Sequence, residues 1–93
     1  EVWHHYEGAP LRLLVFDGDR LREQRIGPGT GAWCTVAPGG SWQAAESGGA
    51  YSLAGCTVGP GFDFDDFSLL ERGTDEARRL ADVQPEAMRF VKR

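Results

Sequence analysis

Residues 2–58 alternate between short apolar runs and turns rich in glycine and proline. Apolar, aromatic and β-branched side chains gather in six runs, at residues 2–6, 11–16, 21–26, 33–36, 42–45 and 51–58. Asp17 and Gly18 separate the second run from the third, and an Asp-Gly pair predicts a tight hairpin because glycine accepts the positive φ that such a turn requires. The third run carries several charged side chains, which favours an edge strand. Short strands at this spacing predict an all-β fold, a small sandwich or barrel.

The pattern changes after residue 70, where apolar positions recur at helical spacing. Thr74 has the position of an N-cap and is followed by two acidic residues, which favour the positive end of a helix dipole. The apolar residues expected on one face of this helix are Ala77, Leu80, Ala81 and Val83. Pro85 opens a second short helix whose buried side is expected to hold Met88 and Val91. We therefore predict a β-barrel unit over residues 1–70 and a helical extension over 71–93.

Composition and charge narrow the class of protein. The 93 residues suffice for one domain, and 10 basic against 14 acidic residues give a net charge of −4. A nucleic-acid-binding surface needs clustered positive charge, and the net charge of this sequence is negative. A membrane-spanning helix needs ~20 apolar residues, and no apolar run in this sequence approaches that length. The sequence therefore predicts a cytoplasmic protein that binds neither nucleic acid nor a membrane. Cys34 and Cys56 lie far apart without a metal-binding spacing and are expected to be buried and reduced.

Three stretches resemble one known family. They are EVWHHYEGAPL at residues 1–11, VAPGGSWQAA at residues 36–45 and GCTVGPGFDFDDF at residues 55–67. Together they resemble the cupin superfamily and, more narrowly, the cupin-5 family, a domain of unknown function. The resemblance covers roughly residues 1–70 and implies a small jelly-roll barrel with one or two C-terminal helices. The phenylalanines of residues 62–67 are expected to close one end of this barrel while the aspartates face solvent.

The resemblance extends to two cupin motifs, with two departures. Glu1 and Gly8 have the Glu-to-Gly spacing of the first motif, whose His-x-His half would lie before residue 1. The chain is therefore expected to lack the N-terminal part of the domain. Pro38, Gly40 and Gln43 have the frame of the second motif, with glutamine in place of the usual histidine. A complete set of metal ligands from this chain is not expected, although a divalent metal remains the alternative cofactor.

Six residues are candidates for a site in the barrel lumen. Glu1 and His4 are the predicted catalytic groups, and the predicted ligand-binding groups are His5, Tyr6, Trp42 and Gln43. Neighbours on a strand face opposite ways, so alternation places Glu1 and His5 together, whereas the family pattern Trp-His-x-Tyr favours His4 and Tyr6. Both assignments stay open at this point.

The resemblance implies a cupin-like protein that binds a small molecule, with an isomerase, epimerase or cyclase reaction on a sugar-like or polar carbonyl compound. One alternative is a metal-dependent oxygenase or lyase that takes its missing histidines from elsewhere. The other is a non-catalytic binding module. Unpaired strand edges associate readily, so we expect a homodimer in each case.

Overall fold

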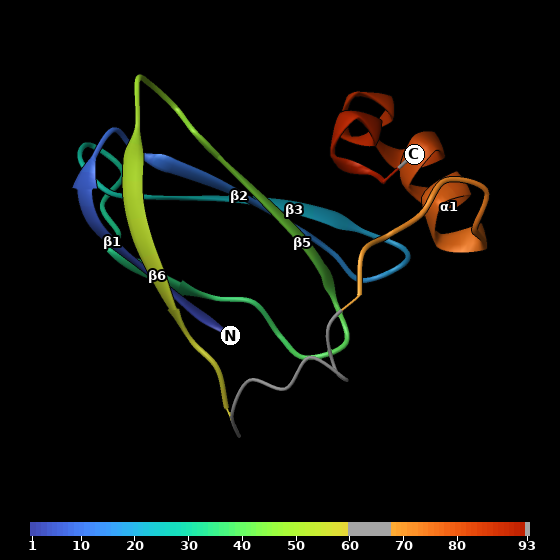
Figure 1. Cartoon of the computed structure of the whole chain (residues 1–93), viewed down its shortest axis with the longest axis horizontal. Helices are drawn as coiled ribbons and strands as arrows, with labels where there is room; N and C mark the ends of the chain where they lie inside the picture. Colours follow the sequence, from blue (N-terminus) through green and yellow to red (C-terminus); the bar gives the residue numbers. More distant parts are fainter. Residues whose placement is uncertain (60–67, 93) are drawn as a thin grey trace.

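Two three-stranded antiparallel sheets form the body of the molecule (Figure 1). The computed structural model describes residues 1–59 and 68–92. The first sheet has the order β4-β1-β6 and the second has the order β3-β2-β5. The strands are β1 (Val2–Gly8), β2 (Leu11–Phe16), β3 (Leu21–Ile26), β4 (Cys34–Val36), β5 (Trp42–Ser47) and β6 (Ser52–Thr57). The predicted all-β class is confirmed, and the string at residues 62–67 lies outside the described residues.

Strand β2 separates two apolar cores because both of its faces are covered. Leu13 and Val15 point toward the first sheet, where they pack with Ala37 and the partly buried Trp3. Leu14 and Phe16 occupy the opposite face of β2 and pack against the C-terminal helices. A strand that is central in its sheet and buried on both faces needs an unbroken apolar run, which residues 13–16 supply.

The C-terminal segment forms α1 (Asp75–Val83) and the 3-10 helix η2 (Pro85–Phe90), which cover the outer side of the second sheet (Figure 1). Thr74 is the N-cap of α1, and its Oγ1 accepts a hydrogen bond from the Ala77 N–H at 3.2 Å, as predicted. Ala77, Leu80, Ala87 and Val91 are the buried positions of this segment. Val83 is exposed, so its predicted place on the buried face is wrong. In the part of the chain described, no helix combines the length and the apolar character needed to cross a membrane.

The predicted hairpin joins β2 to β3. Phe16 pairs with Leu21 at its end, and Gly18 has a φ of 102°. The Asp17 carboxylate accepts hydrogen bonds from the backbone N–H groups of Asp19 and Arg20 at 2.9 and 2.8 Å. A glycine and a short acidic side chain therefore fix the turn, and β3 lies at the sheet edge as its charged residues predict.

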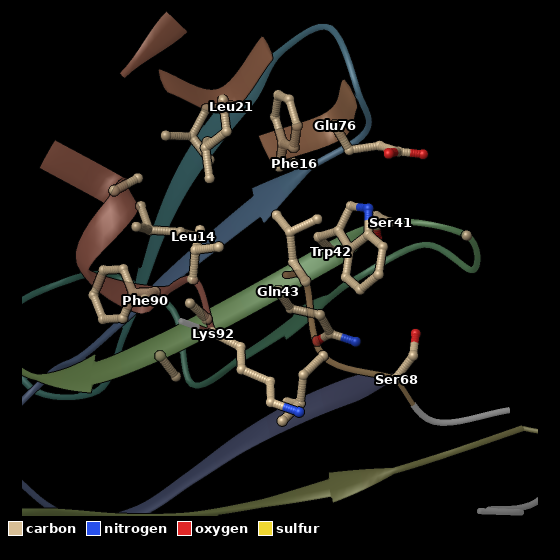
Figure 2. A pocket seen from close by; sticks show the side chains of 18 of the residues that line it. Leu14, Phe16, Leu21, Ser41, Trp42, Gln43, Ser68, Glu76, Phe90 and Lys92 are labelled. Atoms are coloured by element: carbon tan, nitrogen blue, oxygen red, sulfur yellow. The ribbon is translucent and has the colours of Figure 1, made fainter. Parts of the chain in front are cut away.

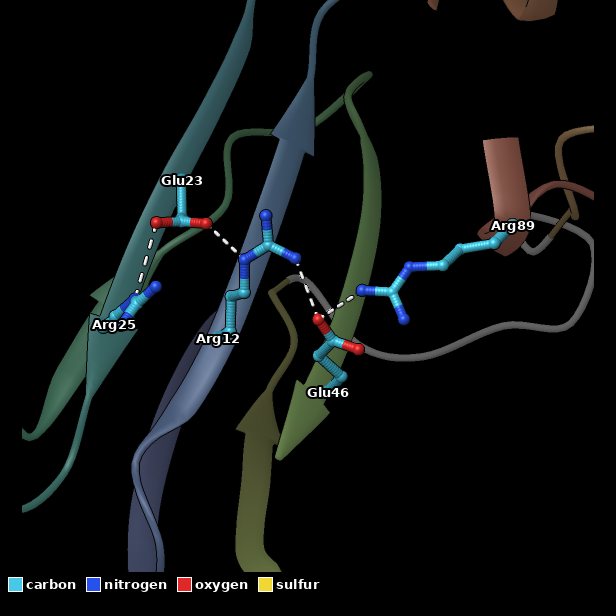
Figure 3. A network of polar contacts seen from close by, with 5 residues as sticks. All are labelled: Arg12, Glu23, Arg25, Glu46 and Arg89. Atoms are coloured by element: carbon cyan, nitrogen blue, oxygen red, sulfur yellow. Dashed lines mark hydrogen bonds and ion pairs between the residues drawn. The ribbon is translucent and has the colours of Figure 1, made fainter. Parts of the chain in front are cut away.

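A network of charged side chains ties η2 to the second sheet (Figure 3). The Arg12 guanidinium on β2 donates to Glu23 on β3 and, at 2.8 Å, to Glu46 on β5. Arg89 of η2 donates to the same Glu46 carboxylate at 2.5 Å. Hydrogen bonds from Arg12 hold the pKa values of Glu23 and Glu46 below their ordinary range. Both carboxylates are therefore ionised at neutral pH, and Glu46 links Arg89 of η2 to the second sheet.

Strand β5 has a free edge among the described residues. Gly48 N–H donates to Pro10 O at 2.8 Å, which continues the β2–β5 ladder by one pair. Because hydrogen-bonded pairs alternate along an antiparallel ladder, the backbone groups of Gln43, Ala45 and Ser47 point away from β2. Strand β6 is the corresponding edge of the first sheet, so neither β5 nor β6 has a second neighbouring strand in the part of the chain that the structure describes.

Candidate functional site

A cavity of about 830 Å³ follows the free edge of β5 (Figure 2). It reaches both faces of this strand. Gln43 and Ala45 line it on the side of the first sheet, and Trp42 and Ala44 line it on the side of the helices. Trp42 and Gln43 are neighbours whose side chains point to opposite faces of β5. Both line the same cavity because the cavity wraps around the unpaired edge of this strand. Its volume lies within the ~300–1,000 Å³ that is usual for small-molecule sites.

Trp3 fixes the orientation of the Gln43 amide. The indole Nε1–H donates to Gln43 Oε1 at 2.8 Å. An indole nitrogen can only donate, so the amide atom that faces it must be the oxygen, which removes the usual ambiguity between oxygen and nitrogen. Among the described residues the Gln43 NH2 group has no partner, so both of its donors are left for a ligand. The site therefore offers a fixed pair of donors at the edge of an apolar cavity.

Glu1 supplies a carboxylate to the same cavity. The backbone of Glu1 exchanges two hydrogen bonds with that of Ala37, at 2.8 and 2.9 Å, which extends the β1–β4 ladder and puts Glu1 on the inner face with Trp3. Partial desolvation of the thiol and, after it, the Glu1 carboxylate raise the pKa of Cys56. Cys56 is therefore a protonated thiol at neutral pH.

Lys92 supplies a positive charge from the other wall. Its backbone N–H donates to Leu70 O at 2.8 Å, which anchors the chain beyond η2 beside the cavity. Its Nζ lies 3.6 Å from Glu71, and the side chain lines the cavity together with Ser68 (Figure 2). Sequence reasoning missed both Lys92 and Trp3 as site residues. Alternation with Glu1 already placed Trp3 on the same face, whereas no local signal in the sequence points to Lys92.

The structure separates the two histidines. His4 pairs across the sheet with Cys34 and Gly55, and its Nε2 lies 3.1 Å from Thr57 Oγ1. Its ring stacks with Tyr6, and neither residue lines the cavity. His5 is buried between the sheets, where its Nε2–H donates to Ala9 O at 2.7 Å and its Nδ1 has no hydrogen-bond partner among the described residues. Of the six predicted site residues, only Glu1, Trp42 and Gln43 therefore line one cavity.

The side chains of β1, β4 and β6 that point away from the second sheet form a surface that we call the outer face. Cross-strand partners share a face, so Val2, Val36 and Thr57 lie together on it, next to the His4–Cys34 pair. The full set is Val2, His4, Tyr6, Glu7, Cys34, Val36, Leu53 and Thr57. Cys34 is on this face and Cys56 is on the inner side; both are exposed free thiols, so their predicted burial is wrong.

The described residues of the cavity do not form a set of ligands for a divalent metal. Among residues 1–59 and 68–92, no three side chains of histidine, cysteine, aspartate or glutamate come together at metal-binding distances. The two histidines are on opposite faces of β1, and the Gln43 oxygen is already occupied by Trp3. The described residues therefore fit an organic ligand better than a resident cation.

Comparisons with known proteins agree with this architecture. The model of the Cupin_5 family, described as Cupin superfamily (DUF985), matches residues 1–70. The crystal structure of protein SO0799 from Shewanella oneidensis superimposes with a TM-score of 0.76 at 23% sequence identity, over 99% of this chain and 60% of that chain. This chain thus spans 60% of the length of SO0799, and the likeness shows a shared fold. No curated protein matches the chain in sequence.

Proposed function

We propose a small-molecule-binding function for this chain, which belongs to the Cupin_5 family of the cupin superfamily (DUF985). The observation that supports it is the Gln43 amide: Trp3 holds its oxygen, and no group in residues 1–59 and 68–92 accepts from its NH2 at the edge of the cavity. Two fixed donors match a carbonyl or carboxylate oxygen of a ligand, and the Glu1 carboxylate matches a hydroxyl group. The Trp42 and Phe16 rings provide apolar surface beside these polar groups. This set of groups favours a sugar-like or hydroxycarbonyl compound.

Replacement of Gln43 by methionine tests this proposal. The probes are a panel of aldoses, ketoses and hydroxy acids, screened by the shift that each causes in the melting temperature. Wild-type protein is expected to bind at least one class, and Gln43→Met is expected to weaken that binding about tenfold or more, since the loss of hydrogen bonds to a buried ligand costs roughly 1.5 kcal/mol.

The matched control is Gln24→Met. Gln24 is a half-buried glutamine of β3 that does not line the cavity, so its replacement should leave the binding constant unchanged. Gln43→Glu adds a sharper test, because a carboxylate still accepts from Trp3 but has no NH2 donors. Equal affinity in Gln43→Glu and wild type, or no stabilisation by any probe, would exclude Gln43 as a ligand-binding donor.

We also propose a proton-transfer reaction on such a ligand, of the isomerase or epimerase type. The support is that Glu1 and Gln43 line the same cavity. The Glu1 carboxylate would take a proton from the carbon beside the ligand's carbonyl group, and the electron pair would move onto the carbonyl oxygen. There the Gln43 NH2 group stabilises the developing charge. A proton then moves from the hydroxyl group on the first carbon to the former carbonyl oxygen, which leaves the first carbon's oxygen to form the new carbonyl group. Delivery of the proton from Glu1 to the former carbonyl carbon completes the aldose–ketose isomerisation, and the step balances without an oxidant.

Hydrogen–deuterium exchange measures this step directly. Each aldose or ketose that shifts the melting temperature is incubated with the protein in D2O, and loss of its C–H signal is followed by proton NMR. Glu1→Gln is expected to slow the exchange about 100-fold or more, as removal of a general base does. Glu7→Gln, at an exposed position outside the cavity, is the matched control and should exchange at the wild-type rate. Exchange that persists in Glu1→Gln would contradict this role of Glu1.

A further inference from the structure

We propose that the ligand of the cavity carries an anionic group and that the Lys92 ammonium group binds it, so that the ligand is an acidic derivative of a sugar. This inference rests on the proposed function, because it concerns a second group of the same ligand. Among the described residues that line the cavity, Lys92 carries the single positive charge. A carboxylate and a phosphate ester both offer the anionic oxygens that an ammonium group recognises.

The backbone on both sides of Lys92 holds it at the cavity. Its N–H donates to Leu70 O at 2.8 Å, and its carbonyl oxygen accepts from the Arg72 N–H at 2.9 Å, which makes a parallel bridge between Glu71 and Lys92. The preceding residue, Val91, is buried in the core that the second sheet shares with the helices. The fold therefore fixes where the Lys92 side chain leaves the backbone.

The ammonium group of Lys92 keeps donors for a ligand. Its acidic neighbour among the described residues is Glu71, and the 3.6 Å between Nζ and the carboxylate is longer than a hydrogen bond. Both side chains are more than half exposed, so this ion pair is weak, and Glu71 does not line the cavity. An ammonium group has three donors. Lys92 can therefore bind an anionic group inside the cavity without first breaking a strong contact.

The polar groups in the same part of the cavity are donors as well. Figure 2 shows the Gln43 amide, the Ser68 hydroxyl and the Lys92 ammonium group on the side of β5 that faces the first sheet. The Glu76 carboxylate lies on the other side of β5, beside Phe16. Hydrogen bonds from a charged donor to a charged acceptor are about twice as strong as neutral ones. An anionic ligand therefore gains more from this group of donors than a neutral sugar does.

The balance of charge in the cavity favours a carboxylate over a phosphate ester. A carboxylate carries one negative charge at neutral pH, which matches the single charge of Lys92, whereas a phosphate ester carries about −1.5 to −2. Glu1 and Glu76 also line the cavity, and their carboxylates repel the additional negative charge of a phosphate. We therefore expect a sugar acid to bind more tightly than the corresponding sugar phosphate.

Titration calorimetry with matched ligands tests the proposal. Glucose, glucuronate and glucose-6-phosphate differ only at the terminal carbon, which bears a hydroxyl group, a carboxylate oxygen pair or a phosphate ester, and the galactose and mannose series are measured in the same way. Wild-type protein is expected to bind a uronate about tenfold more tightly than the parent sugar. Lys92→Met should abolish this preference and leave the affinity for the parent sugar unchanged, whereas Lys92→Arg should retain most of the preference.

Two further variants separate anion binding from a general effect of charge. Arg22→Met, the matched control, removes one positive charge from an exposed position of β3 that does not line the cavity, and it should retain the wild-type preference. Glu71→Gln removes the carboxylate that competes for Lys92. It should tighten uronate binding about two- to fivefold, the range expected from a weak exposed ion pair, without changing the affinity for the parent sugar.

The outcomes distinguish this inference from the proposed function. Equal affinity for a parent sugar and both of its acidic derivatives overturns the anionic ligand, and so does a preference for anions that survives in Lys92→Met. The parent sugar would still bind in either case, so the proposed function would stand. A preference for the phosphate that Lys92→Met abolishes supports the anionic ligand and identifies a phosphate ester as its source. Failure of every ligand in these series and in the Gln43 panel to bind overturns both proposals.

Discussion

Replacing Gly27 with alanine should lower the free energy of unfolding by about 3 kcal/mol, through backbone strain of about 1–2 kcal/mol and steric overlap of about 1–3 kcal/mol. Gly27 has a φ of 115°, a conformation that disfavours any residue with a Cβ atom. A Cβ at this position would lie 2.8 Å from both Cδ2 and Nε2 of His5. The melting temperature should fall by about 15 °C for a domain of this size.

His5 cannot move aside to relieve this overlap. It is 7% exposed, its Nε2–H is bonded to Ala9 O, and its ring meets that of Trp33 edge-on at 5.7 Å between centroids. The matched controls are Gly18→Ala and Gly29→Ala, whose φ values are 102° and 78° and whose Cβ atoms would meet nothing within 4 Å. These controls carry the backbone strain alone, about 1–2 kcal/mol. A loss in Gly27→Ala no greater than in the controls would show that the packing of His5 on Gly27 contributes nothing.

Leu13→Ala should cost about 3–4 kcal/mol, the range for removal of a large side chain from a rigid core. Leu13 is 0% exposed and lies between the two sheets, in contact with the core that contains Val15 and Ala37. The strands on either side are held by their ladders, so they cannot collapse into the space left behind. Urea denaturation should show a lower midpoint with an unchanged slope, because the surface exposed on unfolding stays nearly the same.

Leu53→Ala is the control for Leu13→Ala. Leu53 is a strand leucine of the first sheet on the outer face, and removal of an exposed side chain costs less than about 1 kcal/mol. Similar losses for Leu13→Ala and Leu53→Ala would contradict the assignment of the inter-sheet core.

The sequence predicted the local elements well because their signals are local. All six runs match a strand to within about two residues at each end, and the Asp17-Gly18 turn and the Thr74 N-cap occur where expected. Glycine φ values and side-chain caps depend on a few neighbouring residues, so they can be read from a short window. The exposed position of Val83 was missed because the course of the chain after α1 decides which side of its last turn is covered.

The candidate site depended on contacts between residues far apart in the chain. Gln43 was singled out by its motif, but only its contact with Trp3, 40 positions away, determines which amide atom faces the cavity. Lys92 reaches the same cavity because η2 packs on the second sheet, and no pattern near residue 92 indicates this. Long-range packing thus assembled the polar groups that the sequence leaves scattered.

By itself, the sequence determined that β1 has two sets of side chains, with Glu1, Trp3 and His5 on one face and His4 and Tyr6 on the other. Alternation fixes such sets, since successive side chains of a strand point to opposite faces. Which set is enclosed was decided only by the tertiary structure, in which the pairing of β1 with β4 and β6 and the cover of the second sheet bury His5 and leave Tyr6 exposed. An alternating pattern of side chains is the same whichever face of the strand is buried. Only the packing of the two sheets therefore determines which face that is.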